Sequence, residues 1–423
     1  MKMDLFNFTE HILHKILLYS IISRGMPRAL RLKLICKRFK SLFQPALFES
    51  RVLDDFIAER RISCVLEFME NWYIRRTYGA QKLWHSYLLY RVKNERDSKC
   101  GRFVEIRQLA ENLCPLTDLD YEPTLDALCW LALGRGSYAP GHREAWGSQD
   151  PNEMRSNPGL NLLSAAAYFN QINLAKTLLL DGYCPTLENY LFPSPIQLAA
   201  WAGNADILML FQERRLNWRA KSGPGSIKGA VMLGDMDMIR LAIYPPSRSA
   251  NNITDFAGQR YGYVEAISSA GYDLQNAIFC ARTWEVFQYI DSFFRKPFLS
   301  SPDALAIFLA HQVDLGNIDM VRRLLNEGAD VDGGGRRHNC NPLIIAARYG
   351  HEDIVDLLLE RGANPNHSRG QASGCALMAA ASGGSLNIVK KLLDHGASLE
   401  RAYWDPLRPA IKLEHTAMVK LIM

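Results

Sequence analysis

The fold is decided by two stretches of sequence, NPLIIAARYGHEDIVDLLLERGANPN (341–366) and CALMAAASGGSLNIVKKLLDHGASLE (375–400). Aligned with one another, they share an Ala-Ala pair, a glycine, Ile-Val, Leu-Leu and Gly-Ala, in that order. The shared glycines, Gly350 and Gly384, stand 34 residues apart. Self-similarity at a fixed period of this length is the sequence signature of a repeat architecture.

Each part of this pattern has a physical role in a pair of helices. Small residues at paired positions let one helix pack closely against its neighbour. The glycine after them ends that helix, because glycine adopts the left-handed backbone conformation with the lowest steric cost. The Ile/Val-x-x-Leu-Leu pattern puts an apolar stripe on a second helix. The following Gly-Ala ends this helix and begins an extended loop. Because one unit cannot bury its own apolar face, the pattern predicts a stack of units.

Related stretches occur elsewhere in the chain at similar spacings. Moving back by 34 residues reaches HQVDLGNIDMVRRLLNEGADVD (311–332). Further copies are LLSAAAYFNQINLAKTLLLDGY (162–183), PIQLAAWAGNADILMLF (195–211) and SIKGAVMLGDMDMIRLAI (226–243), and PLRPAIKLEHTAMVKLIM (406–423) begins another unit. The repetition therefore extends over more than half of the chain.

These residues resemble ankyrin repeats, although the family's Thr-Pro-Leu-His opening survives only as Pro342-Leu343 and Pro406-Leu407. The resemblance implies an all-α fold, in which an N-terminal helical bundle precedes an ankyrin-repeat solenoid with short hairpin loops. We expect degenerate ankyrin repeats over residues 160–423. The expected units are about 160–190, 193–222, 224–250, 302–334, 340–370, 374–402 and 405–423, and a poorly matching unit at 257–294 stays open.

The N-terminal segment, residues 8–48, is typical of three short helices. Within it, FTEHILHKIL…LRLKLICKRFKSLFQPALF resembles an F-box, with a leucine-rich first helix, a leucine-cysteine-basic-aromatic stretch and a proline shortly before an aromatic residue. The segment departs from that family at Thr9, where proline is usual, at His11, where Glu is common, and at Phe48, where tryptophan is common. An F-box-like start joined to degenerate ankyrin repeats also resembles a set of uncharacterised proteins of filamentous fungi.

The F-box resemblance implies docking to Skp1, a subunit of a ubiquitin-ligase core. The F-box-like segment is expected to occupy residues 1–50, and the alternative is a small helical bundle with a purely structural role. Carried over by position, the Skp1-docking residues are Leu13, Ile16, Leu17, Pro45 and Phe48.

Residues 51–133 continue as a predicted helical bundle that is rich in aromatic and basic residues. Basic residues interleaved with aromatic ones can bind single-stranded nucleic acid, whereas the alternative is aromatic core packing beneath solvated basic faces. The segment 134–159 carries five Gly and three Pro and is predicted to be a linker or exposed loop. The aromatic and basic residues concerned are Trp72, Tyr73, Tyr78, Trp84, Tyr87 and Tyr90 with Arg75, Arg76, Lys82 and Arg91.

The charge distribution and the cysteines restrict the class of partner and the compartment. Residues 1–100 carry 19 Lys/Arg against 10 Asp/Glu, whereas residues 151–423 carry 26 against 26. A nucleic-acid binder should show a dominant basic face, so the repeat region is a poor candidate. The nine cysteines form no Cys-x-x-Cys pair and are odd in number, which is typical of neither a disulfide framework nor a zinc site. We therefore expect a cytoplasmic or nuclear protein, and no apolar run approaches the roughly 18 residues of a membrane span.

Catalytic signatures are absent from the sequence. It contains no His-Glu-x-x-His, Gly-x-Ser-x-Gly or phosphate-loop motif. Gly333-Gly334-Gly335 lacks the helix pattern and the Lys-Ser/Thr that a phosphate site needs, and Asp330 and Asp332 in the same loop are read as solvated. We expect no enzyme, no cofactor and no metal site.

A stack of helix pairs with projecting loops forms an extended surface of the kind that binds proteins. The predicted function is therefore a protein-interaction adaptor whose repeats hold a target while the N-terminus docks Skp1. The alternatives are a scaffold with a structural N-terminus, or nucleic-acid binding through the aromatic bundle. In ankyrin proteins the loop tips and the exposed side of the first helix contact the partner. Carried onto this chain, these residues are Arg336, Arg337, His338, Arg348, Tyr349, Ser382, Gly383, Tyr403 and Trp404.

Overall fold

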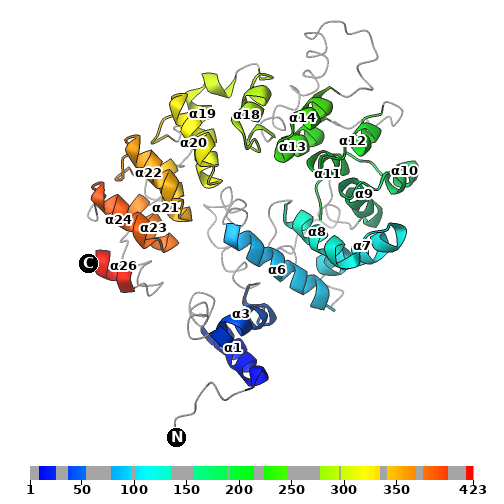
Figure 1. The fold of residues 1–423 in the computed structure, drawn as a ribbon, viewed down its shortest axis with the longest axis horizontal. Coiled ribbons are helices and arrows are strands. Elements are labelled where there is room, and N and C mark those ends of the chain that lie inside the picture. The colour runs from blue at the N-terminus through cyan, green and yellow to red at the C-terminus, as the bar shows by residue number, and fades with distance from the viewer. Residues whose placement is uncertain are drawn as a thin grey trace, which may run out of the picture. The chain divides into compact units, whose positions relative to one another are not determined.

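The computed structural model is built from helices, and Figure 1 shows their order along the chain. All regular elements in the described residues are helical, which confirms the all-α prediction. None of these helices is both long enough and apolar enough to cross a membrane. The structure describes residues 9–24, 37–53, 78–96, 101–134, 157–187, 191–213, 223–244, 277–294, 297–333, 341–367, 375–398 and 416–422.

The chain divides into two compact units. Unit 1 comprises residues 1–165 and 188–193, and unit 2 comprises residues 166–187 and 194–423. The F-box-like segment and the bundle predicted after it therefore lie within one compact unit.

Unit 1 contains two helical subassemblies, α1 with α3 and α6 with α7 and α8. Helix α7 illustrates why these residues are helical, because its buried Phe103, Ile106, Ala110 and Leu113 recur at a spacing of three or four residues. The elements of unit 1 are α1 (Glu10–Arg24), α3 (Lys37–Glu49), α6 (Tyr78–Asn94), α7 (Gly101–Leu113), the 3-10 helix η4 (Cys114–Leu116), α8 (Tyr121–Gly134) and the beginning of α9 (Pro158–Tyr168).

Unit 2 is made largely of helix pairs. Among its first helices, α11 packs on α13, and both α19 and α23 pack on α21. Among its second helices, α20 and α24 both contact α22. The helices are α10 (Ile172–Leu180), α11 (Pro195–Trp201), α12 (Ala205–Phe211), α13 (Gly223–Leu233), α14 (Met236–Ile243), α18 (Trp284–Asp291), α19 (Pro302–Asp314), α20 (Ile318–Asn326), α21 (Pro342–Tyr349), α22 (Glu352–Glu360), α23 (Ala376–Gly383), α24 (Leu386–Asp394) and α26 (Thr416–Ile422), with the 3-10 helix η7 (Phe298–Ser300) before α19.

A left-handed residue separates the two helices of each pair, as the repeat pattern predicts. Gly350 has φ 77° and its N–H donates to the carbonyl of Ala346, which ends α21. Gly384 has the same φ of 77° at the end of α23. In the turn between α9 and α10 this place is taken by Asn170, with φ 57°. Asparagine is one of the few non-glycine residues that tolerate this conformation.

The Gly-Ala pairs end the second helices through a repeated pair of hydrogen bonds. Gly362 N–H donates to the carbonyl of Leu359 at 3.0 Å, and Ala363 N–H donates to the carbonyl of Leu358 at 3.0 Å. One period later, Gly396 and Ala397 make the same two bonds, both at 2.9 Å. These bonds satisfy carbonyls that the end of a helix leaves without partners.

The first helices approach one another closely because small residues line their contact. Ala346, Ala347, Ala380 and Ala381 are fully buried along the junction of α21 and α23. Gly383 comes closest: a methyl group added to it would lie 2.6 Å from the backbone carbonyl oxygen of Arg348. This separation is well below van der Waals contact, so the junction accepts only glycine without moving the backbone.

We predict that Gly383→Ala destabilises the protein. Alanine is favoured over glycine inside a helix by about 1 kcal/mol. Overpacking against a backbone atom that cannot rotate away costs typically about 1–3 kcal/mol, so a net loss is expected. Urea unfolding followed by circular dichroism measures the difference. The matched control is Ser382→Ala at the exposed neighbouring position, which should change the unfolding free energy by less than about 0.5 kcal/mol. A Gly383→Ala variant as stable as the wild type would contradict the close packing.

Candidate protein-binding surfaces

The residues predicted to dock Skp1 fall into two groups in the structure. Leu13, Leu17 and Phe48 are buried in the core of unit 1. Ile16 is half-buried on α1, and Pro45 is exposed on α3. The three buried side chains therefore hold α1 and α3 together, and a partner can reach only Ile16 and Pro45 without rearrangement.

The other face of α1 is apolar and exposed. Ile12 is 40% exposed, Tyr19 67% and Ile22 53%. Together with Ile16 these positions are spaced by four, three and three residues, so they lie on one face of the helix. Leu13, Leu17 and Ile21 are spaced by four residues each and face the core. We call the exposed set, Ile12, Ile16, Tyr19 and Ile22, the α1 face.

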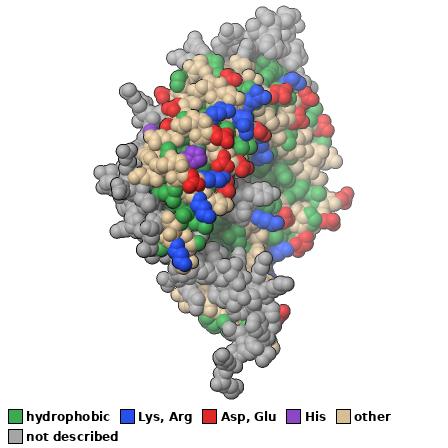
Figure 2. Space-filling model, turned by 60° about the vertical axis from the view of Figure 1, so that its left-hand side comes forward, with side chains coloured by type: hydrophobic (Ala, Val, Ile, Leu, Met, Phe, Trp, Pro, Cys, Tyr) green, Lys and Arg blue, Asp and Glu red, His purple; other side chains and the backbone are tan. Residues whose placement is uncertain are grey.

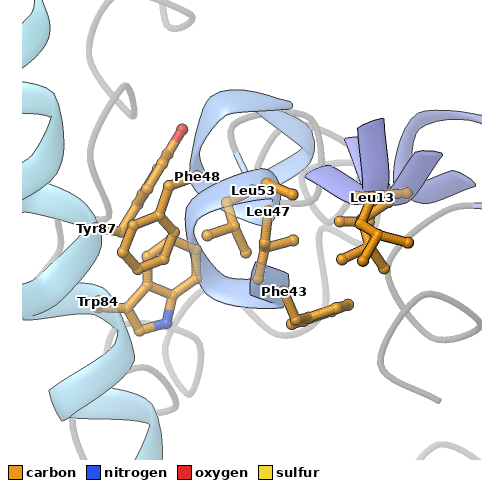
Figure 3. Close-up of a cluster of buried hydrophobic side chains, with 10 residues drawn as sticks. Leu13, Phe43, Leu47, Phe48, Leu53, Trp84 and Tyr87 are labelled. Atoms are coloured by element: carbon orange, nitrogen blue, oxygen red, sulfur yellow. The ribbon is translucent and has the colours of Figure 1, made fainter. Parts of the chain in front are cut away.

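The α1–α3 pair is anchored to α6 by aromatic packing, and Figure 3 shows Phe48 beside Trp84 and Tyr87. The ring centroid of Phe48 lies 5.2 Å from that of Tyr87 and 5.6 Å from that of Tyr90. Trp84 contacts Tyr87 edge to face at 6.2 Å. Contacts of this geometry stabilise aromatic pairs by about 0.5–1.5 kcal/mol beyond the area they bury.

A buried ion pair lies beside this aromatic cluster. The Arg91 guanidinium donates to Glu95 Oε2 at 2.8 Å, and both side chains are nearly inaccessible to water. Arg51, which follows α3, donates to the same oxygen at 3.2 Å. Arg91 also lies over the ring of Phe103, 4.5 Å from its centroid. Breaking a buried pair of this kind is costly because it leaves an uncompensated charge in a low-dielectric site.

The aromatic residues of the predicted bundle that the structure describes, and Arg91 with them, are thus used for packing. Trp84 and Tyr87 are buried, Tyr90 is packed against the core, and the charge of Arg91 is paired with Glu95. Lys82 remains exposed. The side chains of Trp72, Tyr73, Arg75, Arg76 and Tyr78 lie outside the described part of the chain.

The predicted target-binding residues of the repeats are only partly described. Arg348 and Tyr349 are half-buried at the end of α21, and Ser382 and Gly383 are exposed at the end of α23. Glycine is required at position 383 because its backbone packs against the carbonyl oxygen of Arg348. Its presence is therefore explained without a bound target protein. Arg336, Arg337, His338, Tyr403 and Trp404 lie outside the described residues.

In several units, the side chain that follows the left-handed residue contacts the preceding unit. Asn204 Nδ2 donates to the carbonyls of Ala167 at 2.8 Å and Tyr168 at 2.9 Å. His351 occupies the corresponding place after Gly350, and its ring packs over Gly316 with Nε2 3.4 Å from the carbonyl of Asp314. Burial lowers the pKa of the His351 imidazole, which favours its neutral form in the folded protein.

The loops after the second helices are also connected across units. Asp332 Oδ1 accepts the N–H of Asn364 at 3.0 Å, and Asn366 Oδ1 accepts the N–H of Ser398 at 2.7 Å, one period later. Asp332 therefore has a structural role in the loop, rather than the purely solvated one expected from the sequence. Among the described residues, no group of three or more His, Cys, Asp and Glu side chains is arranged to hold a metal ion.

Comparison with known protein families supports the helix-pair repeats in the C-terminal part of the chain. Residues 300–369 match the family model of ankyrin repeats in three copies, and residues 375–402 match the model of a single ankyrin repeat. Residues 300–402 thus contain ankyrin repeats, a class of module that supports protein–protein interaction. A search of curated proteins finds no match.

We predict that removing the Trp84 side chain loosens the α1–α3 pair as well as α6. Deleting a buried Trp or Phe side chain typically costs about 3–5 kcal/mol, and here the lost contacts belong to the cluster that holds Phe48. Hydrogen exchange of Trp84→Ala should therefore speed up over residues 10–24 and 37–49. The control is Lys82→Ala, an exposed position of the same helix. Faster exchange confined to α6 would show that the α1–α3 pair does not depend on Trp84.

Proposed function

We propose that the protein is a non-enzymatic adaptor that holds a target protein on its ankyrin repeats and docks Skp1 through its F-box-like N-terminus. The ankyrin repeats at residues 300–402 support the first half of this proposal. The second half rests on the F-box resemblance of residues 8–48 and on one structural observation, the exposed α1 face. A short helix that is apolar on both sides buries one side in its own core and leaves the other for a partner.

The α1 face refines the proposed docking surface. Of the residues inferred from the resemblance, Ile16 belongs to this face and Pro45 is accessible on α3. Leu13, Leu17 and Phe48 contribute indirectly, because they fix α1 against α3. Tyr19 and Ile22 are the most exposed apolar side chains on the face and are the expected anchors.

We propose that the repeat array is longer than residues 300–402 and begins near residue 158. Asn170, Gly203 and Gly234 provide left-handed residues at the turns of three helix pairs there. The open unit at 257–294 is supported by α18, because Asn317 donates to the carbonyl of Arg282 at 3.0 Å. Asn204 makes the same type of contact to its preceding unit.

The two alternative functions receive less support from the described residues. A nucleic-acid site needs accessible aromatic rings on which bases stack, whereas Trp84 and Tyr87 are buried. Figure 2 shows acidic and basic side chains intermingled on the displayed face, rather than a single basic surface. A scaffold with a purely structural N-terminus would leave the α1 face without a role.

A non-enzymatic role is consistent with the environment of Cys129. Burial raises the pKa of the Cys129 thiol to about 12, so this group stays protonated and packs as an apolar side chain. Reduced cysteines also agree with the cytoplasmic or nuclear location that we propose.

We predict that the full-length chain binds purified Skp1 and that Tyr19→Ala/Ile22→Ala weakens this binding by roughly thirtyfold, the effect of losing about 2 kcal/mol at an interface anchor. Both side chains are exposed, so the double variant should keep the fold. Isothermal titration with the intact chain measures the affinity, and the intact chain is needed because Phe48 packs against α6. Glu111→Gln, an exposed change on α7, is the control. Failure of the wild type to bind micromolar Skp1 would remove the ligase half of the proposal.

The target-binding half makes a separate prediction. Proteins that co-purify with the wild-type chain should be lost from an Arg348→Ala/Tyr349→Ala variant, since Arg and Tyr are frequent interface anchors. Quantitative mass spectrometry compares the two with a Lys390→Ala control, which changes an exposed position on the outer helix α24. Retention of all partners by the double variant would place target binding elsewhere on the array.

A further inference from the structure

Three successive helix pairs, α9–α10, α11–α12 and α13–α14, carry large apolar side chains at their turns. These side chains occupy the one or two positions before the left-handed residues Asn170, Gly203 and Gly234. Leu233 is 39% exposed, and the other four are half-buried. We call this set the turn strip, and its residues are Tyr168, Phe169, Trp201, Met232 and Leu233.

The three turns that carry the strip lie side by side. The Asn204 side chain in the second turn donates to the carbonyl of Tyr168 in the first at 2.9 Å. A methyl group added to Gly203 in the second turn would lie 3.5 Å from Leu233 Cδ2 in the third, which is an ordinary van der Waals contact. The turn strip is therefore shared by three units, and a partner that covers it meets all of them.

The strip carries no charge, and the charges around it balance. The six helices and their three turns contain three basic and three acidic side chains, so neither sign selects a partner. A charged partner side chain placed over the strip would lose its water without gaining a counter-charge, which is unfavourable. An uncharged, apolar partner surface is thus the one that fits. The six charged residues are Lys176, Lys228 and Arg240 with Asp206, Asp235 and Asp237.

The spacing of the turns favours a helical partner. Packed helices lie about 8–10 Å apart, so the apolar side chains of successive turns recur at about this distance. A helix rises about 10 Å in seven residues, and residues seven apart lie on the same face. An extended strand covers about 10 Å in three residues, which places the two side chains on opposite faces. Three turns at this spacing match a helix of about fourteen residues.

We propose that the turn strip binds an amphipathic helix of a partner protein, whose apolar residues recur at intervals of three, four and seven. Helices that lay an apolar face on an apolar surface are a common recognition mode. This inference rests on the proposed function in one respect, that the repeat array holds a target protein. It adds the class of segment that is bound and places the contact on the units before residue 245, away from Arg348 and Tyr349.

A phage library of random peptides of about fourteen residues tests the proposal. The library is selected on the immobilised full-length chain after depletion on the Leu233→Gln variant, which removes peptides that bind elsewhere. The recovered peptides should carry large apolar residues at intervals of three, four and seven, with charged residues on the other face. Hydrogen exchange of the wild-type chain with a recovered peptide should show protection at the three turns, residues 168–171, 201–204 and 232–235.

Fluorescence anisotropy with a fluorescein-labelled recovered peptide measures the affinity of the variants. Leu233→Gln should weaken binding by about tenfold or more, the effect of losing an apolar anchor. Leu233→Met keeps an apolar side chain, and Met209→Gln changes an exposed apolar residue of α12, so both should stay within about twofold of the wild type.

Four outcomes would overturn the proposal. They are recovery of no peptide after depletion, apolar residues at intervals of two in the recovered peptides, protection that omits the three turns, and a loss of affinity in Leu233→Met or Met209→Gln as large as in Leu233→Gln. A parallel selection without depletion separates this inference from the proposed function. Peptides that need Arg348 and Tyr349 but not Leu233 would support target binding by the array and would exclude the turn strip as its site.

Discussion

The helix pairs of unit 2 depend on a backbone turn that requires a left-handed residue between their two helices. A residue with a Cβ atom costs roughly 1–2 kcal/mol in this region, so glycine occupies it at Gly203, Gly234, Gly316, Gly350 and Gly384. The turn is short enough to fold the second helix back on the first, which buries the apolar stripe of one against the other. At two of these turns the next residue, Asn204 or His351, reaches the preceding unit. The left-handed residue and the residue after it thus contribute to the backbone turn, to the pairing of the two helices and, at these turns, to the contact with the preceding unit.

This dependence explains why so much of the array could be predicted from the sequence. Glycine at a left-handed turn and alanine at a close helix contact are imposed by local sterics, and local requirements repeat wherever the unit repeats. The period of 34 residues, the end of α21 at Gly350 and the Gly-Ala end of α22 were therefore visible in the amino-acid sequence. Asn170 was harder to recognise, because asparagine has many other uses and only its φ identifies it as the equivalent of the glycines.

Which side of a helix meets solvent could not be read in the same way. Helix α1 is apolar on both sides, and the choice between Leu13 with Leu17 and Ile12 with Tyr19 is made by α3, whose buried side chains pack against α1. The role of Gly383 was equally hidden, since the carbonyl of Arg348 that excludes a side chain there belongs to the preceding unit. The charge of Arg91 suggested a surface, and only the structure shows it paired with a buried carboxylate. Contacts between residues far apart in the sequence decide which of these side chains are buried, exposed or paired. Such contacts cannot be read from one sequence alone.

The loop hydrogen bonds have a consequence for how such a chain can change length over evolution. Asp332 accepts from the N–H of Asn364, and Asn366 accepts from the N–H of Ser398. In both bonds the acceptor precedes the donor by the same number of residues in the sequence. Losing residues 333–366 would place Asp332 at that distance from Ser398, and duplicating the same stretch would create one more copy of the bond. A gain or loss of this whole period therefore keeps these loop hydrogen bonds in register, whereas a change by any other length breaks it. The gene can lengthen or shorten this part of the protein in one step without first evolving new contacts.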